Sequence, residues 1–184
     1  MFVCTIRESL ELKLLEWKHA PELFQLTERN RDYLREWLPW VDITRSEEDS
    51  KQFISMVLEQ FAQNRGFQCG IFYEGRLAGC IGFHRIDWTN RKTSIGYWLD
   101  EQAQGKGIMA DSCRRLLDYA FEELNLNRVE IRAGVGNAKS RAIPERLGFQ
   151  LEGVCRQEEW VNDRFVDHAV YAMLADDWNS HIRR

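Results

Sequence analysis

Residues 102–107, Gln-Ala-Gln-Gly-Lys-Gly, lie between a segment that alternates like a strand and the most regular amphipathic segment of the chain. The first backbone N–H groups of a helix have no partners within it, and together with the helix dipole they attract anions. Gly105 and Gly107 allow the backbone to approach a phosphate closely and to take a positive φ angle, and Lys106 adds a positive charge. The stretch therefore predicts a phosphate-binding loop.

The elements on either side support this interpretation. In residues 93–99 apolar side chains alternate, which predicts a strand, and in residues 107–124 they recur at helical spacing, which predicts a helix. The sequence has no G-x-x-x-x-G-K-S/T motif, and no G-x-G-x-x-G motif closely follows an early strand. The pattern thus favours a pyrophosphate ligand other than a nucleoside triphosphate or a dinucleotide.

The rest of the chain predicts an α/β (α+β) fold in a single domain over residues 1–184, because strands and helices intersperse without a linker. Further helices are expected to begin near Pro21, Asn30, Ser46 and Asn137. Glu74-Gly75 is a turn signal between two strands. Strands are expected over residues 10–14, 68–73, 76–86, 93–99, 129–135, 149–161 and 165–174.

The composition excludes several classes of protein. A formal charge of −4 and a pI of about 5.7 argue against direct nucleic-acid binding, which requires a basic surface. No window approaches the roughly 20 apolar residues of a membrane span. Five scattered cysteines suit reduced thiols, and the four histidines lack metal-ligand spacing, so we expect no metal site. We expect a cytoplasmic protein that does not bind membranes.

A second motif connects the loop to a family. Asn137-Ala-Lys-Ser140 precedes a helix that ends on Leu147-Gly-Phe149, and it follows Q-x-x-G-x-G in the right order. The pair resembles the GNAT superfamily of N-acetyltransferases. Residues 12–15, 30–40 and 153–178 resemble its RimJ/RimL-type members, which acetylate the N-terminal amine of ribosomal proteins. The resemblance implies the acyl-CoA N-acyltransferase fold, with a mixed, mostly antiparallel seven-stranded sheet flanked by helices and splayed central strands.

The resemblance also implies how acetyl-CoA binds and reacts. An amine attacks the thioester directly, without an acyl-enzyme, while pantetheine lies between the strands at 93–99 and 128–135. Residues expected to bind the cofactor are Trp98, Leu99, Gln102, Gln104, Gly105, Lys106, Gly107, Ile108, Met109 and Asn137. Asn137 also suits a helix N-cap.

Two residues are the candidates for proton transfer. By resemblance, Ser140 protonates the departing thiolate, and Glu159 acts as a base through water. Each residue also has a structural interpretation. Ser140 could accept a hydrogen bond from a free N–H group in the first turn of the helix, and Glu159 could be a strand residue exposed to solvent. Trp37 and Trp40 are equally suited to packing and to shaping the acceptor cleft.

The acceptor is open at this level. A protein N-terminus, such as that of a ribosomal protein, is favoured, and the alternative is a small amine such as a polyamine, an amino acid or an aminoglycoside. A non-catalytic acyl-CoA-binding module is a third hypothesis, which the presence of Ser140 and Glu159 disfavours. A homo-oligomer is expected from the family alone.

Overall fold

The computed structural model describes the backbone of residues 3–182 and the side chains of residues 3–180. The described residues form one eight-stranded sheet in the order β1-β2-β3-β4-β5-β6-β8-β7. Its strands are β1 (Val3–Arg7), β2 (Leu10–Leu14), β3 (Phe67–Tyr73), β4 (Arg76–Phe83), β5 (Lys92–Leu99), β6 (Arg128–Gly134), β7 (Gln150–Val161) and β8 (Arg164–Leu174). The α-helices are α1 (Ala20–Arg29), α2 (Arg31–Leu34), α3 (Glu47–Ala62), α4 (Ile108–Asp118), α5 (Ala138–Arg146) and α6 (Ala175–Ile182).

The mixed, mostly antiparallel sheet is confirmed, and it has one strand more than the seven expected. The additional strand, β1, is an edge strand that pairs with β2 and buries none of its residues fully. Such a strand shows no clear apolar face in the sequence, because it packs on one neighbour only. Among the described strands, only β5 and β6 pair in parallel. A parallel pair requires a crossover, and α4 provides it.

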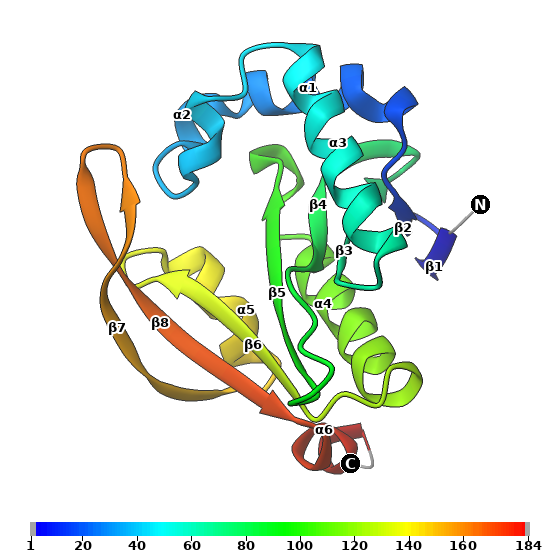
Figure 1. The fold of residues 1–184 in the computed structure, drawn as a ribbon, viewed down its shortest axis with the longest axis vertical. Coiled ribbons are helices and arrows are strands. Elements are labelled where there is room, and N and C mark those ends of the chain that lie inside the picture. Colours follow the sequence, from blue (N-terminus) through cyan, green and yellow to red (C-terminus); the bar gives the residue numbers. More distant parts are fainter. Residues whose placement is uncertain (1–2, 183–184) are drawn as a thin grey trace.

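Helices cover the sheet on two faces (Figure 1). On one face, α4 packs into a large cluster through residues such as Cys113 and Leu117, together with Ile95 and Leu99 of β5. On the other face, α1 and α3 pack against Leu77 and Cys80 of β4. Because successive side chains of a strand point to opposite faces, each central strand contributes to both clusters.

The predicted turns and caps are present. Glu74 and Gly75 both have positive φ angles and join β3 to β4. Ser46 caps α3 by accepting a hydrogen bond from the Asp49 N–H at 3.3 Å. The helix expected over residues 107–124 is α4, which continues into a π-helical turn over Tyr119–Glu123. Local polar residues therefore set the element boundaries that position the site.

Candidate active site

The loop before α4 is held in place from α1. Asp100 accepts a hydrogen bond from the Gln102 N–H at 3.2 Å and forms an ion pair with Arg29 at 2.8 Å. Asn30 Oδ1 accepts one from the Glu101 N–H at 3.0 Å. These contacts fix the start of the loop, and its remainder leads to the N-terminus of α4.

Both glycines of the loop adopt the left-handed conformation. The φ angle is 76° at Gly105 and 75° at Gly107, and Gly107 is the N-cap of α4. No described side chain caps this helix, so the N–H groups of its first turn remain available. Free backbone N–H groups at a helix N-terminus are suited to binding an anion.

Most of the predicted cofactor residues line one cleft of about 1510 Å³. They are Trp98, Leu99, Gln104, Gly105, Gly107, Ile108, Met109 and Asn137. Gln102 and Lys106 do not line it: Gln102 is exposed, and the Lys106 ammonium lies 5.1 Å from the centre of the Tyr73 ring. The Lys106 side chain is thus directed away from the cleft, and only its backbone belongs to the loop.

The cleft runs between two strands that separate. β5 and β6 pair only from Lys92–Arg128 to Ile95–Ile131. Beyond this point β5 continues to pair with β4, and β6 with β8. The facing edges of β5 and β6 therefore carry backbone groups that lack a strand partner. Figure 1 shows β6 and β8 leaning away from β5, so the predicted splay is confirmed.

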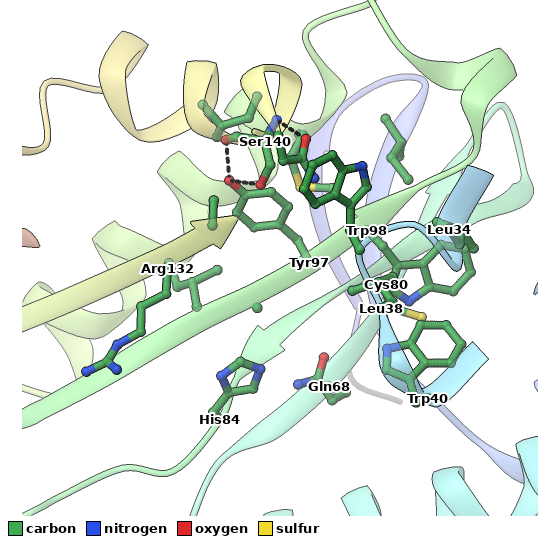
Figure 2. A pocket seen from close by; sticks show the side chains of 18 of the residues that line it. Leu34, Leu38, Trp40, Gln68, Cys80, His84, Tyr97, Trp98, Arg132 and Ser140 are labelled. Carbon is green, nitrogen blue, oxygen red and sulfur yellow. Dashed lines mark hydrogen bonds between the residues drawn. The ribbon is translucent and has the colours of Figure 1, made fainter. Parts of the chain in front are cut away.

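The N-terminus of α5 faces this gap. Asn137 caps the helix as expected, because its side chain accepts a hydrogen bond from the Ser140 N–H at 3.0 Å. The Tyr97 hydroxyl donates to the Ser140 carbonyl at 2.9 Å and lies 3.4 Å from Ser140 Oγ (Figure 2). Burial raises the pKa of Tyr97, so this phenol stays protonated. The sequence predicted a strand over residues 93–99, which includes Tyr97, and did not indicate this contact.

The two adjacent glutamates of β7 have different partners. Glu159 lines the cleft, and its Oε2 lies 3.3 Å from His168 Nε2 of β8. Glu158 forms an ion pair with Arg132 of β6 at 3.0 Å. The contact between Glu159 and His168 crosses from one strand to the next. The spacing of the two residues in the sequence therefore did not reveal it.

The tryptophans left undecided by the sequence both line the cleft. A Cβ placed on Gly134 or Gly136 would lie about 3 Å from the Trp37 ring, so the indole covers the end of β6. Trp40 contacts Trp98 with ring centroids 5.8 Å apart. Packing and cleft shaping are thus not exclusive, because these rings do both.

Cysteine chemistry is not supported by the structure. Cys80 lines the cleft but is buried, and burial raises its pKa and that of Cys113. A raised pKa disfavours the thiolate, which is the reactive form. Among residues 3–180, no group of three or more His, Cys, Asp or Glu side chains could hold a metal ion. No helix among the described residues is long and apolar enough to cross a membrane.

Comparisons with known proteins agree with this geometry. Residues 9–150 match the acetyltransferase (GNAT) domain family. The chain is 42% identical over 179 residues to YdaF of Bacillus subtilis (strain 168), a candidate ribosomal N-acetyltransferase, covering 97% of this chain and 98% of YdaF. It is 36% identical over 173 residues to the ribosomal-protein-serine acetyltransferase of Escherichia coli (strain K12), covering 93% and 96% of the two chains.

A solved structure of a related enzyme has the same fold as this chain. It is that of RimL, a ribosomal L7/L12 alpha-N-protein acetyltransferase, in complex with coenzyme A. RimL superposes with a TM-score of 0.92 at 30% sequence identity, over 96% of this chain and 99% of RimL.

Proposed function

The chain belongs to the GNAT acetyltransferase family, and from this premise we propose that it transfers the acetyl group of acetyl-CoA to the N-terminal α-amine of a ribosomal protein. The proposal rests on one observation: a single cleft joins the gap between β5 and β6 to the N-terminus of α4, which no described side chain caps. Such a protein acceptor would place the reaction in the cytoplasm.

The residues present fit acetyl-CoA as the donor substrate. The N–H groups from Gly105 to Met109 surround the start of α4, where a pyrophosphate would be attracted by the helix dipole. The Gln104 N–H, also expected to contribute, instead donates to the Glu101 carbonyl at 3.3 Å. The edge of β5 at Trp98 and Leu99 lacks a partner on the β6 side, so the amides of pantetheine would complete it like an added strand.

The chemistry requires a neutral amine, stabilisation of the oxyanion and protonation of the leaving thiolate. Near pH 7 an α-amine with a pKa close to 8 has a substantial neutral fraction, whereas less than about 0.1% of a lysine is neutral. Glu159 receives the proton of the arriving ammonium through water, and Ser140 donates to the thiolate. Contacts with Tyr97 on one side and His168 on the other support these two positions.

The low reactivity of the cysteine in the cleft supports direct attack of the amine, without an acyl-enzyme. Cys80 is 2% exposed and has a raised pKa, so the thiol in the cleft is a poor nucleophile.

The experiment that tests the proposal measures thiol release from acetyl-CoA with a panel of acceptors. The panel contains peptides with the N-termini of ribosomal proteins, the same peptides with blocked N-termini, polyamines, amino acids and aminoglycosides. We expect release with free N-terminal peptides and none with the blocked ones. Release with small amines alone would transfer the proposal to that class, and tight CoA binding with no release would indicate a binding module.

A further inference from the structure

The two faces of β5 are chemically different at the point where it leaves β6. Tyr97 points to the face covered by α4 and α5, where its hydroxyl contacts Ser140. Gly96 and Trp98, its neighbours on the strand, face the other side, and Trp98 packs against the cluster formed with α1 and α3. The proposed proton donor to the thiolate thus lies on one face of the sheet, and Gly96 and Trp98 of the opposite face also line the cleft.

His84, which follows β4, occupies that opposite face. A Cβ built on Gly96 would come within 2.2 Å of His84 Nε2 and 2.6 Å of Cε1, so the imidazole lies directly against this glycine. Gly96 is the first residue of β5 beyond the last pair with β6, Ile95–Ile131. Figure 2 shows His84 beside Gln68, with its ring in the cleft.

The ring is held by a contact on its other nitrogen. His84 Nδ1 lies 3.2 Å from Ser94 Oγ, a neighbour across the β4–β5 pair. In the tautomer whose Nδ1–H donates to this hydroxyl, Nε2 presents a lone pair where the strands separate. The sheet therefore orients the imidazole as a proton acceptor.

Burial lowers the pKa of His84, which keeps the imidazole neutral near pH 7. The other charged or titratable side chains that line the cleft are Tyr33, Asp49, Cys80, Arg85, Tyr97, Arg132, Lys139, Arg146, Glu159 and His168. Burial is the sole resolved cause of the shift, so none of these groups dominates the protonation of His84.

On acetylation of an α-ammonium the nitrogen loses two protons, and because the departing sulfur takes one up, the whole reaction releases one. One must leave before attack, and this is the proton that the proposed function assigns to Glu159 through water. The second leaves when the nitrogen has bonded to the carbonyl carbon, and neither Ser140 nor Glu159 has been assigned to it.

We propose that His84 Nε2 accepts this second proton, directly from the nitrogen of the acceptor; the inference rests on the proposed function. The amine nitrogen bonds to the thioester carbonyl carbon, and its proton passes to Nε2. The carbon–sulfur bond then breaks, and the sulfur leaves with the electron pair and is protonated from the Ser140 side. His84 returns its proton to solvent, and Ser140 regains from solvent the proton that it gave to the sulfur. Attack and departure thus occur on opposite faces of β5.

The test compares His84→Gln with wild type, using the acceptor peptide that wild type acetylates. We expect kcat to fall about 10²-fold or more, with KM for the peptide and Kd for CoA nearly unchanged. Protonation of His84 contributes to the acid limb of the wild-type kcat profile, so this limb should become shallower in the variant. His19→Gln is the matched control, because it removes another histidine whose pKa burial lowers, at a place outside the cleft.

Two further variants separate catalysis from folding. Gly96→Ala keeps the imidazole but forces it to move, so kcat should again fall while the thermal transition shows a folded protein. In His84→Ala, added imidazole should restore part of kcat in a concentration-dependent way, which a purely structural role would not allow.

The outcomes are distinguishable. If wild type acetylates its peptide but His84→Gln retains kcat within about threefold and an acid limb as steep as that of wild type, the role of His84 is wrong and the proposed function stands. If wild type acetylates no amine of the panel, the proposed function fails, and the role of His84 fails with it.

Discussion

Replacing Gly105 by alanine tests the loop at one backbone position. The residue has a φ angle of 76°, and a Cβ placed there would meet no other atom within 4 Å. The methyl group therefore creates no clash in the free protein. It introduces only the cost of a left-handed conformation, about 1–2 kcal/mol for a residue with a Cβ.

This cost has two expected consequences. For a chain of this length, it lowers the melting temperature by roughly 2–8 °C. If the loop instead relaxes out of the left-handed region, its N–H groups no longer converge on the pyrophosphate. Each hydrogen bond to a charged group is worth about 1.5–3 kcal/mol, so losing one raises the Kd for CoA roughly ten- to a hundredfold.

Calorimetric titration with CoA measures the Kd, and a thermal scan of the free protein measures stability. Gly75→Ala is the matched control. Gly75 has a φ angle of 77°, it also has no atom within 4 Å of a built Cβ, and it lies in the β3–β4 turn outside the cleft. We expect both variants to lose similar stability, and only Gly105→Ala to lose CoA affinity.

The result that would refute this reasoning is a Kd for Gly105→Ala equal to that of Gly75→Ala, together with an unchanged melting temperature for Gly105→Ala. An unchanged melting temperature would mean that the loop has relaxed, and an equal Kd would then mean that its conformation does not contribute to CoA binding. The proposed phosphate site would then have to be abandoned.

Three other predictions concern the site and the stability of the protein. Glu159→Gln should lower kcat/KM at least about tenfold on the acid side of the range from about pH 6 to 9, and a profile that matches wild type would remove its role as a base. Asn137→Ala should destabilise the protein by about 1 kcal/mol in chemical denaturation, because α5 loses its cap, and Asn137→Ser should restore this stability. If Asn137 also contacts CoA, only the stability and not the Kd should recover in the serine variant. The free energy of unfolding should decrease as the pH falls below about 6.5, because burial lowers the pKa of His19 and His84 in the folded state and the unfolded chain then binds more protons. Denaturation between pH 5 and 8 should show a shallower dependence in His84→Gln, and an unchanged slope would contradict the assignment.

Much of the fold was predictable because its signals are local. The glycines at 75, 105 and 107 mark positive φ angles, and Ser46 and Asn137 mark helix starts through their own side chains. β1 was missed because an edge strand buries little, and burial is what produces an alternating pattern.

The candidate site was predictable only in part. The glycine loop and the N-terminus of α5 were predictable, because their residues act on backbone N–H groups only a few positions away in the sequence. Contacts between different elements are not local in this sense. Tyr97–Ser140 joins a strand to a helix, and His84–Gly96 and Glu159–His168 depend on how neighbouring strands pair.

The sequence by itself determined the loop that we propose binds the donor. A loop of glycines before an amphipathic helix, followed by a capped second helix, sets its backbone conformation through short-range chemistry. The tertiary structure alone decided the part of the cleft that we propose receives the acceptor. There β5 separates from β6, and strand pairing brings His84, Trp37 and Glu159 from distant segments around one cleft. Register and sheet order set that arrangement, and neither is a local property of the chain.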